Sequence, residues 1–151
     1  MQAAAWRGWR ELNDDRRRVE RAEAGFDDRL RAAVAEADAP RAGSRVELPR
    51  GAARVTELAC APRDVARLWP EAPDHVTCVV MVEVESARHT PEEVLGGVDV
   101  VDARGQQHFS IDRRVERTRA GATVRLAFAS RVRPRGALLR LGDHRFLARL
   151  E

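Results

Sequence analysis

The stretch VTCVVMVEVE at residues 76–85 decides the fold class. Its side chains alternate between two faces, and one face is apolar throughout: Val76, Cys78, Val80, Val82 and Val84. Successive side chains of a β-strand point to opposite sides, and β-branched residues are favoured in strands. The stretch therefore predicts a half-buried strand with its valine face in the core.

The same alternation recurs on both sides of this stretch. It is clear at residues 123–128, 139–141 and 146–150, and weaker at residues 45–48, 53–60, 98–103 and 108–111. Turn-forming residues separate these segments, and only short helical turns are expected between them, at residues 64–68 and 90–95. Since no long helix lies between any two strands, the pattern predicts a mainly β protein. Its expected fold is an antiparallel, immunoglobulin-like β-sandwich over residues 45–151.

The N-terminal segment has a different composition. Residues 3–39 are rich in alanine, arginine and acidic residues and contain no proline, and Pro40 cannot continue a helix. We expect residues 1–40 to form a long helical segment that acts as a spacer or an association helix. An apolar row recurs every seven residues, at Leu12, Val19, Phe26 and Ala33, but charged residues interrupt the adjoining row. Self-association through residues 5–37 and packing of the helix on the sandwich both remain open.

The two cysteines, Cys60 and Cys78, exclude a disulfide-rich scaffold and an all-cysteine metal site. Both fall on inward-facing positions of expected strands. A disulfide between them could form if the two strands are neighbours or face each other across the core. Two buried free thiols that act as small apolar side chains are the alternative.

The positive charge lies mostly near the C-terminus. All 27 basic residues are arginines, and the net charge is only +3, which does not by itself imply nucleic-acid binding. Residues 112–151, however, carry eleven arginines against four acidic residues, a net charge of +7. Four of these arginines occupy outward positions of expected strands and others fall in adjoining turns: Arg125, Arg140, Arg145 and Arg149 in strands, and Arg113, Arg114, Arg117 and Arg119 in turns.

These arginines would form a basic surface if the three C-terminal strands share one sheet. Such a surface could bind an acidic protein face, phosphates or acidic glycans. The alternative is a solvated sheet surface whose charges prevent edge-to-edge pairing. No aromatic residues are interleaved with the arginines, which counts against specific nucleic-acid recognition.

No motif indicates catalysis. His108, Ser110 and Asp112 alternate along one expected strand, but same-face neighbours on a strand stand about 6.6–7 Å apart, too far for the contacts of a catalytic triad. We interpret them as a solvated polar face opposite Phe109 and Ile111. The four histidines are scattered without metal-ligand spacing, and neither a phosphate-binding glycine loop nor a lysine is present. We therefore expect no enzyme activity, no metal and no cofactor.

Three segments carry a resemblance to a known family. They are VDVVDARGQQHF at residues 98–109, AGATVRLAF at residues 120–128 and GALLRLGD at residues 136–143. They resemble the telokin-like, immunoglobulin-like extracytoplasmic domains of Gram-positive, actinobacterial-type bacteria, over about residues 45–150. The chain departs from that family in lacking a lipoprotein cysteine or transmembrane helix, and in offering His108 and Phe109 where a tyrosine is common. The resemblance implies a non-catalytic binding domain outside the membrane and carries over no functional residue.

These observations together favour a non-enzymatic interaction module. We expect it to be the soluble portion of an envelope-associated protein, bound to the membrane only through a segment absent from this sequence, with a protein partner or an acidic surface as its ligand. Two alternatives remain open. One is an intracellular assembly protein that oligomerises through its N-terminal helix, and the other is a polyanion-binding module that uses the C-terminal arginines. The compartment is uncertain, and a cytoplasmic location is the alternative to an extracytoplasmic one.

Overall fold

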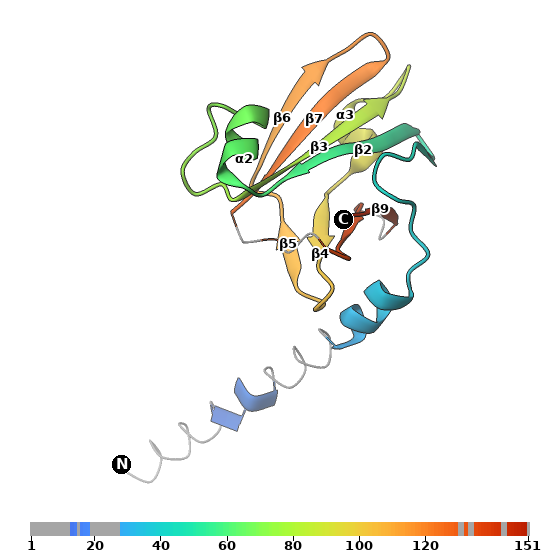
Figure 1. Ribbon diagram of the computed structural model, residues 1–151. Helices are drawn as coiled ribbons and strands as arrows, with labels where there is room; N and C mark the ends of the chain where they lie inside the picture. The colour runs from blue at the N-terminus through green and yellow to red at the C-terminus, as the bar shows by residue number, and fades with distance from the viewer. Residues whose placement is uncertain are drawn as a thin grey trace, which may run out of the picture.

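The protein is mainly β, with two antiparallel sheets and a few short helices (Figure 1). The structure is a computed structural model, and it describes residues 13–14, 16–18, 28–129, 132, 135–142 and 145–150. Both sheets lie within the part of the chain where the sequence predicts strands. The expectation of a mainly β, antiparallel fold is confirmed at this level.

The first sheet has five strands and the second has four. In spatial order the first sheet consists of β1 (Val46–Leu48), β2 (Gly51–Ala59), β3 (Cys78–Glu85), β7 (Gly121–Phe128) and β6 (Asp112–Arg117). The second consists of β5 (Gln107–Phe109), β4 (Asp99–Val101), β8 (Leu138–Arg140) and β9 (Phe146–Arg149). Every strand pairing in both sheets is antiparallel.

The core lies between the two sheets, with β3 near its centre. Val80 and Val82 of β3 are fully buried and belong to one cluster with Val100 of β4 and Leu139 of β8. The largest of the fully buried side chains is Phe128, at the end of β7. The apolar face predicted for residues 76–85 is therefore the core face of β3.

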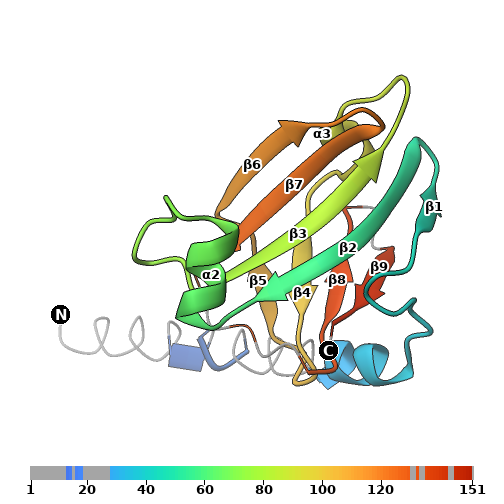
Figure 2. The same cartoon turned by 45° about the horizontal axis from the view of Figure 1, so that its top comes forward.

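The other face of β3 is covered at one end by a short helix, α2 (Pro62–Leu68). Val65, Leu68 and Trp69 are buried against Val79 of β3 and Ala127 of β7. Figure 2 shows α2 lying across the ends of β2 and β3. A second short helix, α3 (Pro91–Leu95), begins at Thr90, whose hydroxyl accepts the Glu93 N–H at 3.2 Å, as its sequence predicts.

The N-terminal segment is helical at residues 13–14, 16–18 and 28–36 and non-helical at residues 37–40. The remainder of the predicted helix, including most of the row at Leu12, Val19 and Phe26, lies outside the described residues. Within them, the helix ends at residue 36 and not at Ala39. At this end the guanidinium of Arg149 donates to the carbonyl oxygens of Val34 and Ala37, groups that a helix end leaves unpaired.

The described end of this helix packs on the four-stranded sheet through the row that adjoins Ala33. Ala33 is exposed, whereas Val34 is buried against Val101 of β4 and Leu138 of β8. Leu30, Ala37 and Phe146 extend this small cluster on the outer side of the four-stranded sheet. The packing row is therefore the one that Leu30 and Ala37 share.

The sequence does not predict strand β6. Residues 112–117, assigned there to turns, form β6 at the edge of the five-stranded sheet. An edge strand with a single apolar residue, Val115, has no apolar face to reveal it. In the sequence, Ala120 and Gly121 mark the turn that follows, and in the structure this turn is closed by Thr118 N–H donating to Gly121 C=O at 3.1 Å.

Candidate functional site

The arginines predicted to form one basic surface lie in two different sheets. Arg125 is on β7 of the five-stranded sheet, whereas Arg140 and Arg149 are on β8 and β9 of the four-stranded sheet. Arg145 lies just before β9, where its carbonyl accepts the Leu141 N–H at 2.8 Å. The basic surface was expected only if the three C-terminal strands share one sheet. They do not, because β7 lies in one sheet and β8 and β9 lie in the other.

Arg125 lies on the outer face of the five-stranded sheet, where basic and acidic side chains alternate. It forms an ion pair with Glu116 of β6 at 3.2 Å. Arg114, next to it on β6, lies 3.5 Å from Glu71, and Arg54 of β2 pairs with Glu83 of β3. This face therefore carries neighbouring charges of both signs and offers an anion no uniformly basic sheet.

Arg140 takes part in a nearly buried ion pair. It donates from Nε and Nη2 to the two carboxylate oxygens of Asp99 at 3.0 and 2.6 Å, and the two side chains are 13% and 9% exposed. Gln107 also donates to Asp99, at 3.1 Å. A two-pronged arginine–carboxylate contact of this kind is among the stronger polar contacts in proteins. It joins β4, β5 and β8 and pairs the charge of Arg140 with an acid.

Arg149 anchors the helix at residues 28–36. It donates to the carbonyl oxygens of Val34 at 3.0 Å, Ala37 at 2.8 Å and Gly136 at 3.2 Å. Its backbone N–H donates to Pro40 C=O at 2.7 Å. The side chain that the sequence places on a binding surface therefore joins the N-terminal helix to β9.

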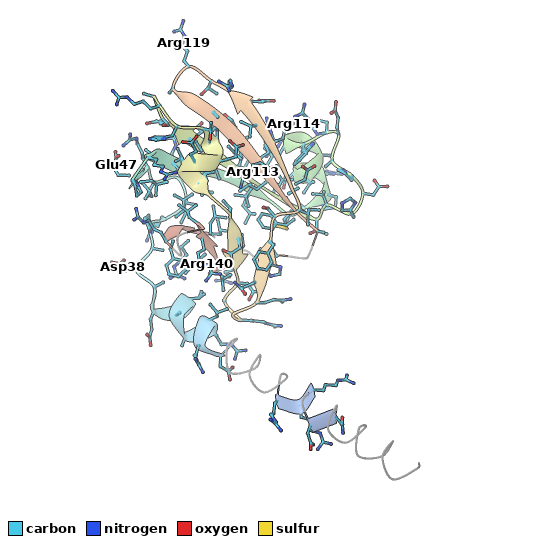
Figure 3. All side chains as sticks on the ribbon, turned by 180° about the vertical axis from the view of Figure 1, so that it is seen from behind. Asp38, Glu47, Arg113, Arg114, Arg119 and Arg140 are labelled. Carbon is cyan, nitrogen blue, oxygen red and sulfur yellow. A yellow bond between two sulfur atoms is a disulfide. The ribbon has the colours of Figure 1, made fainter. Side chains whose placement is uncertain are left out.

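Arg117 and Arg119 are both exposed. Arg117 ends β6, and Arg119 projects from the turn that leads to β7, as Figure 3 shows. Neither forms an ion pair with a described residue. Arg113, also on β6, donates to the carbonyl of Gly96 at 3.1 Å. β6 and the turn after it thus carry Arg113, Arg114, Arg117 and Arg119 within seven residues.

The same part of the chain exposes apolar side chains. Among the described residues, the exposed large apolar side chains are Phe109, Ile111 and Val115, with exposed fractions of 65%, 49% and 37%. All three lie where the chain passes from β5 at the edge of one sheet to β6 at the edge of the other, and Figures 1 and 2 place these two strands on the same side of the sandwich. We call this region, residues 109–119, the open edge.

The exposure of Phe109 and Ile111 corrects a prediction. The alternation of residues 108–112 predicts a solvated His108 opposite Phe109 and Ile111, whereas His108 is 2% exposed and the two apolar side chains are exposed. The buried ring of His108 is in hydrogen-bond contact with Asp102, whose Oδ2 lies 3.1 Å from His108 Nε2. The other carboxylate oxygen of Asp102 accepts the backbone N–H groups of Arg104 and Gln106 at 2.9 and 3.0 Å.

Two hollows flank the open edge. One, of about 370 Å³, is lined by Phe109, Arg113 and the buried pair of Asp99 and Arg140, among others. The other, of about 540 Å³, is lined by Val115, Arg117 and the loop at residues 86–92. The side chains on the inner side of β6 therefore border concave surface at both ends of the strand.

A third hollow lies elsewhere, beside α2. It has a volume of about 1180 Å³ and is lined by apolar side chains, among them Trp69 and Val76, and by a few polar ones, Asp74, Thr77 and Arg135. Thr77, one of those few, donates its hydroxyl to Phe128 C=O at 3.1 Å.

The disulfide between Cys60 and Cys78 borders this hollow. Cys60 follows β2 and Cys78 begins β3, and their Cα atoms are 4.2 Å apart. The two strands are neighbours in the sheet, which is the arrangement that a bridge requires. The disulfide closes the loop that carries α2.

Asp102 has an altered acidity because of its contacts. Burial alone would raise its pKa, but the hydrogen bond from His108 and the two backbone N–H groups outweigh burial and hold the pKa of Asp102 below its usual range. The pair is enclosed and faces neither Ser110 nor Asp112 across a cavity that any described residues form. Its role is to fix the turn between β4 and β5.

We expect this contact to make stability depend on pH under acidic conditions. Because the pKa of Asp102 is lower in the folded chain than the value of about 3.9 in an unfolded one, its contribution is present above that value. It is lost as the pH falls through the folded-state pKa. The urea midpoint of the wild type should fall more steeply below about pH 4 than that of Asp102→Asn, which should be less stable at pH 7 by about 1–3 kcal/mol. Parallel pH profiles for the two proteins would contradict this assignment.

Comparisons with known proteins identify no relative: no family model, no curated protein and no solved structure matches the chain. Among the described residues, no helix is both long and apolar enough to cross a membrane. No cluster of three or more potential metal ligands occurs in that same part of the chain. The open edge is therefore defined by the position and exposure of residues 109–119 alone.

Proposed function

We propose that this protein is a non-enzymatic binding module that holds a protein partner at its open edge. The observation that carries the proposal is the exposure of Phe109, Ile111 and Val115 together within seven consecutive residues. Exposed apolar side chains scattered singly are ordinary, whereas several that lie close together along an edge of the fold, with charged side chains beside them, suit an interaction site. Here Arg113, Arg117 and their neighbours supply the rim.

The strand order supports an immunoglobulin-like sandwich, in which loops and edges commonly carry binding. Apart from β1, the first sheet runs β2-β3-β7-β6 and the second β5-β4-β8-β9. Numbered along the chain as A, B, C, C′, D, E, F and G, these are the orders A-B-E-D and C′-C-F-G. That arrangement matches the two sheets of immunoglobulin-type sandwiches. β1 extends the A edge as a hairpin.

The disulfide supports a location outside the cytoplasm. Structural disulfides persist in oxidising compartments and are rare where thiols are kept reduced. We propose that this chain is the soluble portion of an envelope-associated protein, in keeping with the family resemblance. Free cysteines in the purified protein would remove this support.

The two alternative functions find less support in the described contacts. Of the apolar residues available for association through the N-terminal helix, the described ones Leu30, Val34 and Ala37 already pack on the four-stranded sheet, and Leu12, Val19 and Phe26 lie outside the described residues. Polyanion binding would need unpaired arginines on one sheet, but Arg125 and Arg140 are matched with acids. The open edge involves neither the helix residues that pack on the sheet nor Arg125 and Arg140.

A displayed peptide library tests the proposal. Peptides enriched on the folded wild-type protein should bind the double variant Phe109→Ser/Ile111→Ser at least about tenfold more weakly, since a few buried apolar anchors usually carry most of an interface's affinity. Isothermal titration with the synthesised peptides measures the change. Both residues are exposed, so the variant should keep the wild-type thermal midpoint.

Ala66→Ser is the matched control, because Ala66 is an exposed residue of α2 away from the open edge. It should bind the enriched peptides as the wild type does. Equal binding by wild type and Phe109→Ser/Ile111→Ser would overturn the assignment of the open edge, and so would a library from which no peptide is enriched.

A further inference from the structure

The backbone of β6 pairs with no described strand on one of its two sides. β6 is the last strand of its sheet and pairs only with β7 among the described strands. Thr118 and Gly121 form a hydrogen-bonded pair in the same register that sets Arg117 opposite Ala122. Hydrogen-bonded pairs alternate along an antiparallel ladder, so residues 112, 114 and 116 face β7 with their backbone groups. The backbone groups of Arg113, Val115 and Arg117 therefore point toward the open side.

A local contact agrees with this assignment. The N–H of Arg113, which should point away from β7, donates to the side chain of Asp112 at 2.8 Å. At the start of the strand, Ile111 N–H donates to Ala127 C=O at 2.8 Å, and Asp112 also lies opposite Ala127. Two residues thus oppose one, which is a β-bulge at the point where the chain enters the edge.

The side chains of β6 divide into two rows. Arg113, Val115 and Arg117 lie opposite Leu126, Val124 and Ala122, which face the core, so these three form the inner row. They also line the two hollows of the open edge. The outer row of Asp112, Arg114 and Glu116 belongs to the mixed-charge face. A strand added to β6 would place its own side chains directly beside both rows.

A second copy of this chain fits the edge poorly. Two β6 strands paired antiparallel about Val115 would bring Arg113 of each copy opposite Arg117 of the other, twice in one interface. Like charges directly opposite each other destabilise a strand pair. The same positions would be satisfied by acidic side chains on a different partner.

We propose that β6 binds an extended acidic segment of a protein partner by strand addition, antiparallel to β6, with the pattern acid-x-apolar-x-acid. This rests on the proposed function and specifies its ligand. The two acids lie opposite Arg117 and Arg113, and the apolar residue lies opposite Val115. Continuing in the same direction, a second apolar residue two positions later reaches Ile111 and the hollow beside Phe109. Backbone hydrogen bonds supply affinity in such a complex, and alternate side chains supply specificity.

A designed peptide tests this mode of binding. The segment Glu-Lys-Val-Glu-Glu-Thr-Val, flanked by glycine and serine, places acids opposite Arg117 and Arg113 and also matches the outer row, with lysine opposite Glu116 and glutamate opposite Arg114. We expect the folded wild-type protein to bind it in a fluorescence anisotropy titration. The same peptide with lysine in place of each glutamate should not bind, and binding of both peptides alike would overturn the charge pattern.

Two variants at one position separate backbone from side-chain recognition. Val115→Pro removes an N–H that points to the open side. This N–H makes no hydrogen bond to β7, so the substitution leaves the pairing of β6 with β7 intact. Edge strands tolerate proline at such positions. It should weaken peptide binding at least tenfold, whereas Val115→Thr, which keeps the N–H, should change binding less than threefold. Equal binding by Val115→Pro and the wild type would exclude strand addition.

A peptide-side measurement keeps the test decisive if Val115→Pro does not fold. N-methylation of the peptide residues that face Arg113, Val115 and Arg117 should abolish binding to the wild type, and N-methylation of the intervening residues should not. If neither methylated peptide loses affinity, strand addition is wrong. Concentration-dependent dimerisation of the protein without peptide, abolished by Val115→Pro, would also overturn the proposal in favour of self-pairing.

The outcomes also separate this inference from the proposed function. Loss of binding in Phe109→Ser/Ile111→Ser without loss in Val115→Pro would leave the open edge as a binding site and reject only the strand addition. Peptide binding unaffected by either variant would reject both.

Discussion

Replacing Asp99 by alanine is expected to cost about 3–5 kcal/mol of folding stability, because it removes one partner of a nearly buried ion pair. Arg140 would keep its charge at a position where only 13% of the side chain meets solvent. The carboxylate that it loses takes two of its N–H donors and one from Gln107. Urea unfolding followed by circular dichroism measures the change, as a lower midpoint at an unchanged slope.

The double variant Asp99→Ala/Arg140→Met should recover much of this loss, since apolar replacement of both partners leaves no unpaired charge. Arg54→Met is the matched control. It breaks the pair with Glu83 on the outer face of the five-stranded sheet, where both side chains are about half exposed, and such pairs contribute about 0–1 kcal/mol. A loss below about 1 kcal/mol for Asp99→Ala, comparable with the surface pair, would show that the contact does not hold β4, β5 and β8 together.

This result also bears on the open edge. Asp99 and Arg140 line the hollow next to Phe109, so their contact fixes the shape of one end of the surface. Arg140 was predicted from the sequence as a ligand-binding residue. Its contacts give it a positioning role there, and the ligand-facing charges we propose are Arg113 and Arg117.

The sequence predicts those strands that bury one face, because burial imposes a period of two on the apolar residues. β3 and β7 are of this kind, and both lie in the middle of the larger sheet. The short helices are predicted for a local reason as well, since Thr90 and Pro91 form a recognisable helix start. Elements whose pattern comes from local contacts or from the core can thus be found without a structure.

β6 could not be found in this way, because neither local contacts nor burial in the core sets its sequence pattern. It has one partner strand and a largely exposed surface, so its six residues show a mixture of charges around Val115. The arginines posed a related problem: Arg149 and Arg117 look alike in sequence, yet one anchors a helix and the other is exposed at the edge. Long-range pairing decides which of them is available, and pairing between distant strands is not encoded in local periodicity.

Removing the disulfide is the second change with a large expected effect, about 3 kcal/mol of stability. The bridge closes a loop over a sequence separation of 18 residues, and tethering a loop of this size lowers the entropy of the unfolded chain by about that amount. The double variant Cys60→Ala/Cys78→Ala tests this. Alanine is preferable to serine because Cys78 is fully buried, and a hydroxyl there would add a desolvation cost of its own.

Reductant distinguishes the bridge from the packing of the sulfur atoms. The wild type should lose about 3 kcal/mol when unfolded in the presence of dithiothreitol, and the double alanine variant should not respond to it. The lost restraint should also appear locally, as faster hydrogen exchange at residues 61–77, which carry α2 between the two cysteines. Two reactive thiols in the unreduced, denatured wild type would contradict the bridge. They would also remove the main support for an oxidising compartment, while leaving the open edge unaffected, because none of its proposed contacts depends on the sulfur atoms.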